Sequence, residues 1–263
     1  MTPPSALTDY ASSTGSRTVT VTSSDRWEDV TVALQVVHDG FVEAGYMDPQ
    51  PSGCRMISPY LNPGTIFFVA HIDGEAVGAL ALIPDGPFGL PSDRAFREEL
   101  DAMRATGRPL FECGSLVVRE EWRRHTRRVV AGLVAAAMKV FRQTLNANVV
   151  ISVEPGQGGF YASMLSARPV AEPRPLFGAP ALLLESTYDD MVDVMTESSS
   201  NGHRMLRELV FGPDEGWSVQ RSTGEAWPAH EVGALLEEQG CLAGLLGQMR
   251  LVGAFLPALF GVA

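Results

Sequence analysis

The sequence predicts a mixed α/β domain over residues 17–190, followed by a helical extension over 191–263. Three observations support this prediction. Apolar runs of strand length recur along the first two thirds of the chain, helical periodicity separates several of them, and only helical patterns follow residue 187. Residues 1–16, rich in Ser, Thr and Pro, are expected to form a flexible tail.

Spacing of apolar residues and turn chemistry define the elements of the domain. The pair Asp73-Gly74 stands between two apolar runs and indicates a tight hairpin, while Ser92 is suited to cap a helix. The expected elements, in chain order, are a strand at 17–22, a helix at 25–45, strands at 65–72 and 76–83, a helix from Ser92 to Gly107, a strand at 110–119, a helix at about 124–144, a strand at 148–155, a short helix at 158–165 and a strand at 180–185.

The extension is expected to contain helices at about 187–197, 203–210 and 229–249. The last of these carries an apolar stripe from Val232 to Met249 that requires a partner surface. Four roles stay open for this helix and the apolar tail 254–260: capping the core, lining a tunnel for an apolar chain, pairing two subunits as a homodimer, or touching a membrane surface.

Composition excludes several classes of function. The net charge of -11 argues against non-specific binding to nucleic acid, whose phosphates require basic partners. The three cysteines, Cys54, Cys113 and Cys241, lie too far apart to suggest a zinc site or a disulfide framework, so no metal and a cytoplasmic protein are expected. No apolar run reaches the length of a transmembrane helix, and the common phosphate-loop, dinucleotide and nucleophile-elbow motifs are absent.

An ordered series of short strings runs through residues 38–186. The strings are FVEAGYMDP (41–49), Pro63, Thr65, Phe67 and Val69 before the hairpin, DGEAVGALAL (73–82), Asp85, GLP (89–91), EEL with Arg104 (98–104), GRPLFE (107–112), Phe160-Tyr161 and GAPALLLE (178–185). Together they resemble the GNAT superfamily of acyltransferases and, within it, the long-chain N-acyl amino acid synthases, relatives of the acyl-homoserine-lactone synthases.

The resemblance implies a fold and a place for the acyl donor. The expected sheet is mixed, mostly antiparallel and splayed at its middle strands, with helices on both faces. A pantetheine chain would pair with exposed amides of the strand at 110–119, as an added strand pairs with a sheet edge. The donor-binding residues expected there are Gly114, Ser115, Leu116, Val117 and Val118.

Glu112 and Tyr161 are the catalytic candidates. The resemblance places an acidic residue near Glu112, where a carboxylate in an apolar cleft can act as a general base toward an amine. It places at Tyr161 a phenol that donates a proton to the departing thiolate. The competing interpretations are a structural ion pair between Glu112 and an arginine, and a core aromatic at Tyr161.

A basic run follows the central strand and opens the next helix, where amides and the helix dipole favour phosphate. The resemblance implies that the phosphates of coenzyme A or of an acyl carrier protein lie here, so Arg123, Arg124, Arg127 and Arg128 are candidates for binding them. The competing interpretation is a solvated face. The carrier protein is favoured slightly, because such proteins are acidic and a basic rim would steer them.

Two hypotheses of function follow. The first is an N-acyltransferase that moves an acyl group, expected to be fatty acyl, from an acyl carrier protein or acyl-CoA to an amino acid or another small amine, with the thioester as co-substrate and no tightly bound cofactor. The second is a domain of the same fold that binds a thioester or a protein partner without chemistry. It is motivated by residues 123–128, which carry no glycine where the superfamily's phosphate loop has two.

Overall fold

In the computed structural model, residues 8–10, 19–24, 26–142, 144, 147–212 and 227–241 are described. The strands are β1 (Thr8–Tyr10), β2 (Val19–Ser24), β3 (Ile66–Ile72), β4 (Glu75–Pro84), β5 (Leu110–Val118), β6 (Asn148–Val153), β7 (Arg168–Pro169), β8 (Arg174–Leu176) and β9 (Ala179–Thr187). The α-helices are α1 (Trp27–Glu43), α2 (Asp93–Arg104), α3 (Thr126–Phe141), α4 (Gly158–Leu165), α5 (Tyr188–Glu197), α6 (Asn201–Phe211) and α7 (Ala229–Glu238). Three 3₁₀ helices are η1 (Ser58–Leu61), η2 (Glu120–His125) and η3 (Pro155–Gln157).

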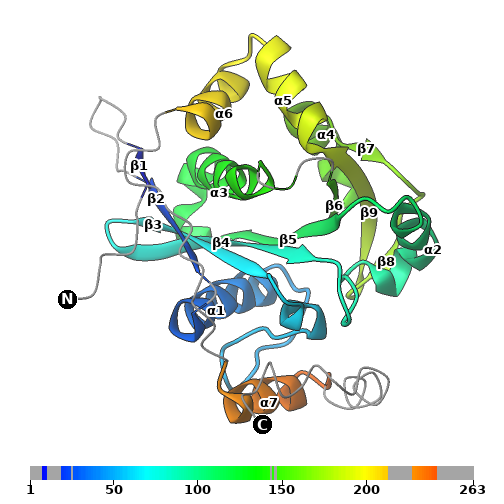
Figure 1. Ribbon diagram of the computed structural model, residues 1–263. Helices are drawn as coiled ribbons and strands as arrows, with labels where there is room; N and C mark the ends of the chain where they lie inside the picture. The colour runs from blue at the N-terminus through cyan, green and yellow to red at the C-terminus, as the bar shows by residue number, and fades with distance from the viewer. Residues whose placement is uncertain are drawn as a thin grey trace.

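The strands form one sheet in the order β1-β2-β3-β4-β5-β6-β9-β7, and β8 pairs with β9. Every neighbouring pair is antiparallel except β5 and β6, which run parallel. The expected mixed, mostly antiparallel sheet is confirmed. Figure 1 shows it crossing the middle of the molecule, with helices above and below.

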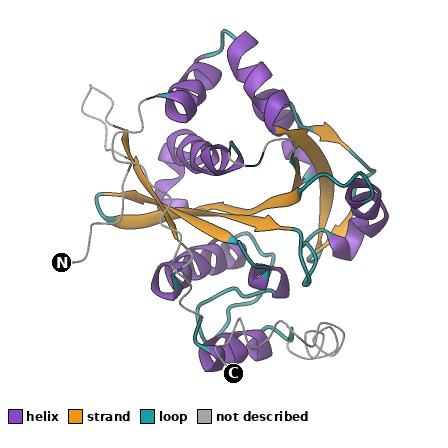
Figure 2. Ribbon diagram, in the orientation of Figure 1, coloured by secondary structure: helices purple, strands orange, loops and turns teal. Residues whose placement is uncertain are grey.

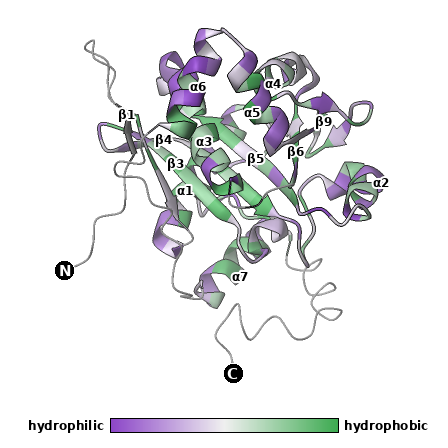
Figure 3. Cartoon of the chain, turned by 45° about the horizontal axis from the view of Figure 1, so that its top comes forward, coloured by the Kyte–Doolittle hydropathy of each residue, from purple (hydrophilic) through white to green (hydrophobic). Residues whose placement is uncertain are grey.

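Helices cover both faces of the sheet, as predicted (Figures 1 and 2). Helices α3, α4, α5 and α6 share one apolar cluster with the sheet, and α1, α2 and α7 share another. In Figure 3 the strands are largely hydrophobic, whereas the outer helices also carry hydrophilic residues. Helix α7 buries Val232, Leu235 and Leu236 against the second cluster, so the described part of the last predicted helix caps the core.

Two tight hairpins set the register of the pairs β3–β4 and β8–β9. Asp73 and Gly74 both have positive φ, 54° and 82°, so the predicted Asp-Gly turn joins β3 to β4. Phe177 and Gly178 form the matching turn between β8 and β9, with φ of 51° and 84°. This second hairpin carries Phe177 to the site described below.

The sheet splays at its centre. Strand β5 pairs with β6 only from Leu110 to Glu112, although both strands continue beyond that point. Within the described residues, no strand joins β5 on that edge after Glu112. A bulge then shifts the register with β4 near Ser115, whose φ is 56°. The predicted splay is thus confirmed, and it begins at the candidate base.

The structure differs from the sequence-based expectations at several places. Residues 8–10 lie in the expected tail but form β1, paired with β2. The short strands β7 and β8 have no alternating apolar pattern and were not predicted. The basic run opens with the 3₁₀ helix η2, so α3 starts at Thr126. Residues 242–249, the second half of the last predicted helix, lie outside the described residues.

The division between domain and extension is not visible in the core. Buried residues of α5 and α6, including Met191, Met195 and Leu206, pack in the same cluster as α3 and the sheet. No helix within the described ranges is both long and apolar enough to cross a membrane.

Candidate active site

A cleft of about 210 Å³ occupies the splay between β5 and β6. Its strand walls are residues 112–116 of β5 and 151–153 of β6, and residues 176–181 of the β8–β9 hairpin close it from the side. Phe41, Tyr46, Arg55 and Ile57 enter from the end of α1 and the following loop. Several of these side chains are apolar, so the cleft suits an extended chain with an apolar end.

Glu112 lies at the closed end of the splay and is only 2% exposed. Its Oε2 accepts a hydrogen bond from the Ser92 amide at 2.9 Å, and its Oε1 accepts one from the Ser92 hydroxyl at 2.7 Å. No arginine or lysine of the described chain forms an ion pair with Glu112. The structural ion pair considered from the sequence is therefore not found there.

Burial raises the pKa of Glu112 from its ordinary value near 4.5 to about 7, against the two Ser92 hydrogen bonds, which lower it. The nearby Asp93 carboxylate raises this pKa further and Arg55 lowers it. A carboxyl group that titrates near 7 can accept a proton from an ammonium group at neutral pH.

Ser92 stands at the N-cap position of α2, but its side chain does not cap the helix. The sequence-based prediction of a capping serine is wrong in this respect, because Ser92 has helical φ and ψ of -73° and -12° rather than the extended backbone of an N-cap residue, and its hydroxyl binds Glu112. The neighbouring Asp93 accepts the hydrogen bond of the Leu90 amide at 2.7 Å and fixes the loop that leads into the helix.

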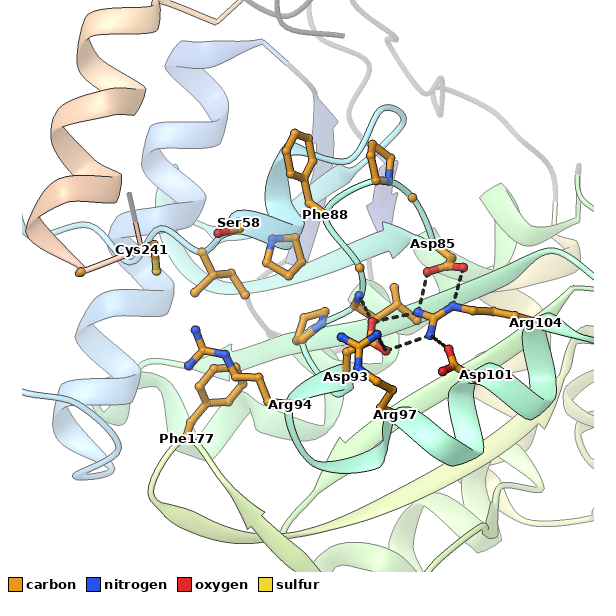
Figure 4. A pocket seen from close by; sticks show the side chains of 18 residues that line it. Ser58, Asp85, Phe88, Asp93, Arg94, Arg97, Asp101, Arg104, Phe177 and Cys241 are labelled. Carbon is orange, nitrogen blue, oxygen red and sulfur yellow. Dashed lines mark hydrogen bonds and ion pairs between the residues drawn. The ribbon is translucent and has the colours of Figure 1, made fainter. Parts of the chain in front are cut away.

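Arg104 clamps this loop to α2 (Figure 4). Its guanidinium donates to both oxygens of Asp85 and to both oxygens of Asp93, at 2.7 to 2.9 Å. Burial raises the pKa of Asp93, but hydrogen bonds from Arg104 and the Leu90 amide outweigh it and hold that pKa below its ordinary value. Two of the residues that carried the family resemblance, Asp85 and Arg104, thus hold Ser92 in place for Glu112.

A second, larger cavity of about 460 Å³ is lined by this loop and by the first turns of α2. Phe177 lines both cavities, and Figure 4 shows its ring next to Arg94. The guanidinium carbons of Arg55 and Arg94 each lie 5.1 Å from the centre of the Phe177 ring. The ring therefore forms part of the wall between the two spaces.

Tyr161 comes from α4, lines the cleft and is 8% exposed. Burial, and to a lesser extent Cys113, raises the pKa of Tyr161 to about 12. The phenol therefore keeps its proton at neutral pH and can donate it. Burial also raises the pKa of Cys113 to about 12, which leaves its thiol protonated and a poor nucleophile.

The expected donor-binding residues divide into two groups. Gly114, Ser115 and Leu116 line the cleft, whereas Val117 and Val118 do not. Val118 packs in the cluster of α3, and Val117 packs in the cluster of α1. At the bulge, the Ser115 hydroxyl forms a hydrogen bond with the Tyr60 hydroxyl.

Arg55 is a residue of the cleft that sequence reasoning missed. It is only 5% exposed, and its Nη1 donates to the Tyr60 hydroxyl at 2.9 Å. The Phe41 ring lies 4.4 Å from its guanidinium carbon, so aromatic faces stabilise the charge. No carboxylate of the described chain pairs with it, although a buried guanidinium ordinarily has such a partner.

The basic run lies at the start of α3, outside the cleft. Arg123 forms ion pairs with Glu43 at 2.8 Å and with Glu120 at 3.4 Å, and Arg124 donates to His125. Arg127 and Arg128 lie in the first turn of α3. None of the four lines the cleft that holds Glu112. In the part of the chain that the structure describes, no group of three His, Cys, Asp or Glu side chains could hold a metal ion.

A splayed, mostly antiparallel sheet with a buried acid at the point of splaying defines an acyltransferase of the GNAT kind. The chain belongs to the N-acyl amino acid synthase FeeM family, whose model matches residues 32–187. The family resemblance in the sequence is confirmed by this match. Membership favours the acyltransferase hypothesis over a domain that binds without chemistry. None of the curated proteins matches the sequence.

Solved structures share the fold. The N-acyl amino acid synthase FeeM from uncultured soil microbes is 18% identical, with a TM-score of 0.57 over 70% of this chain and 97% of that one. The acyl-homoserine-lactone synthase LasI is 10% identical, with a TM-score of 0.50 over 66% and 90%. TofI, solved with an inhibitor and MTA, is 14% identical, with a TM-score of 0.50 over 66% and 95%.

Proposed function

We propose that this protein transfers an acyl group from a phosphopantetheine thioester to the amino group of an amino acid, with Glu112 as the general base. The observation that carries the proposal is the position of Glu112, buried at the closed end of a cleft. Beyond Glu112, the edge of β5 that faces β6 has no strand partner among the described residues. In this cleft an extended donor and a base can meet.

The donor is an acyl carrier protein thioester or acyl-CoA. The open edge of β5 offers backbone groups to a pantetheine chain, in the way that a sheet edge accepts an added strand. The bulge at Ser115 turns backbone groups away from the β4 ladder, which suits contact with a thioester carbonyl. Arg124 and Arg127, at the exposed start of α3, are the proposed contacts of the donor's phosphate.

The acceptor carries a carboxylate. Arg55 supports this part of the proposal, because it is a buried guanidinium on the wall of the same cleft and forms no ion pair with a carboxylate among the described residues. A substrate carboxylate would complete its charge pairing through charge-assisted hydrogen bonds. Bound in this way, an α-amino acid would hold its amino group toward Glu112.

Tyr161 completes the proposed mechanism. Its neutral phenol lines the cleft and can donate a proton to the departing sulfur. The carbon–nitrogen bond forms as the free amine attacks the thioester carbonyl, and the carbon–sulfur bond breaks as the thiol leaves.

The test uses purified full-length protein with acyl carrier protein thioesters and with acyl-CoA of several chain lengths. Each donor is offered the common amino acids together with amines that lack a carboxylate. Formation of N-acyl amino acid by mass spectrometry, with equal release of thiol, is the expected result. A folded protein that forms no N-acyl product from any pair would overturn the proposal.

A further inference from the structure

Glu112 is poorly placed to touch the acceptor, and this raises the question of how a proton reaches it. Glu112 lines the cleft but is only 2% exposed, and each of its carboxylate oxygens already accepts a hydrogen bond from Ser92. Ser92 itself is fully buried and does not line the cleft. A more exposed group bound to this pair is better placed than Glu112 to touch a substrate nitrogen in the cleft.

Ser152 provides that group. It lies on β6, on the wall of the cleft, and is partly exposed there. Its hydroxyl forms a hydrogen bond with the hydroxyl of Ser92. Three oxygen atoms, from Ser152, Ser92 and Glu112, thus form a continuous chain from the cleft to the buried carboxylate.

The direction of the hydrogen bonds follows from the number of protons. A serine hydroxyl has one proton to donate and two lone pairs to accept with. Ser92 donates its proton to the ionised Glu112, so it must accept the proton of Ser152. Ser152 then presents a lone pair to the cleft, which is the orientation that receives a proton from a substrate.

We propose that Ser152 and Ser92 relay the acceptor's proton to Glu112, with Ser152 as the group that touches the amine. This inference rests on the proposed function. The ammonium nitrogen gives one proton to the Ser152 Oγ while Ser152 gives its own to Ser92 and Ser92 gives its own to Glu112. The freed amine attacks the thioester, the carbon–nitrogen bond forms and the carbon–sulfur bond breaks. Tyr161 gives its proton to the departing sulfur and takes up the second nitrogen proton, and Glu112 returns its proton to solvent along the same chain.

The experiment compares Ser152→Ala, which removes the hydroxyl, with Ser152→Thr, which keeps one. Ser186→Ala is the matched control, because Ser186 is a buried strand serine whose hydroxyl binds the Leu165 carbonyl, outside the cleft. For Ser152→Ala we expect kcat to fall about 10-fold to 100-fold with little change in the donor KM, since a water molecule can replace part of the relay. Ser152→Thr should retain most of the rate, and Ser186→Ala should match the wild-type kcat.

Kinetics in mixtures of light and heavy water provide a readout that a structural role would not move. The wild-type rate should fall along a curve as deuterium increases, because several protons move together, and the Ser152→Ala curve should be closer to a straight line. Circular dichroism and thermal unfolding confirm that each variant is folded.

Four outcomes decide the proposal. A wild-type kcat in folded Ser152→Ala, a Ser152→Thr variant as slow as Ser152→Ala, or a straight wild-type isotope plot would each overturn the relay while leaving the proposed function intact. A folded wild-type protein without any N-acyl product would overturn the proposed function and the relay with it.

Discussion

Ser92 donates two hydrogen bonds to Glu112, one from its amide at 2.9 Å and one from its hydroxyl at 2.7 Å. This contact joins the loop before α2 to the strand where the sheet opens. The contact fixes the orientation of the Glu112 carboxyl group without neutralising its charge. Burial raises the pKa of this group to about 7. The site's chemistry thus depends on a residue that is itself outside the cleft.

Replacement of Glu112 by Gln should slow transfer by about 10²-fold to 10⁴-fold, the usual contribution of a general base. In the wild type the rate should rise with pH and reach half its maximum near the Glu112 pKa of about 7, since only the ionised carboxylate accepts a proton. The variant should lose this rise. Initial rates of both proteins between pH 5 and 9 measure it, and a retained midpoint near 7 in the variant would assign the rise to another group.

The stability of the fold should also depend on the ionisation of Glu112. Its pKa is higher in the folded chain than the ordinary 4.5, so its favourable contribution is complete below pH 4.5 and is lost as pH rises through about 7. A pKa difference of this size corresponds to roughly 3 kcal/mol. Relative to Glu112→Gln, the wild type should lose about this much free energy of unfolding between pH 4.5 and pH 8. Urea unfolding at the two pH values measures the difference, and equal losses in both proteins would contradict it.

Arg104→Ala should destabilise the fold and reduce activity together. It leaves the buried Asp93 without its cation, which typically costs roughly 3 kcal/mol, and it frees the loop that positions Ser92. Arg97→Ala is the matched control, because Arg97 lies on the same helix, is exposed, and is 4.0 Å from Asp93. Its effect should stay within about 0.5 kcal/mol. Thermal unfolding and kcat are the readouts. Equal stability of the Arg104→Ala and Arg97→Ala variants would contradict the stabilising role of Arg104.

Arg55→Met should weaken binding of the amino acid acceptor and leave binding of the thioester donor unchanged. Loss of the guanidinium should raise the KM for an amino acid about 10-fold to 100-fold and leave the KM for the matching amino acid amide nearly unchanged. Arg94→Ala is the control, because Arg94 contacts the same Phe177 ring from the neighbouring cavity. An Arg55→Met enzyme that still prefers the free acid over the amide would place the carboxylate elsewhere.

The sequence predicts the strands and the acidic residue of this site, but not the side chains that contact that residue or complete the cleft. Asp73-Gly74 predicted a hairpin because few residues accept the positive φ of that turn. Glu112 stood out because an acid within an apolar strand requires a partner. That partner, Ser92, lies 20 residues away and is brought to it by tertiary packing, so local pattern assigned it to a helix cap. Arg55 stands in a Pro/Gly-rich loop without periodicity, and nothing local indicated its burial between rings.

The most direct measurement is hydrogen exchange at the backbone amides of residues 113–118, with and without a non-reactive thioether analogue of an acyl-pantetheine donor. If the open edge of β5 grips the donor beside Glu112, these amides should become protected on binding, while those of β2 and β3 should stay as they were. Saturating analogue that protects a different surface and leaves β5 unchanged would contradict the account.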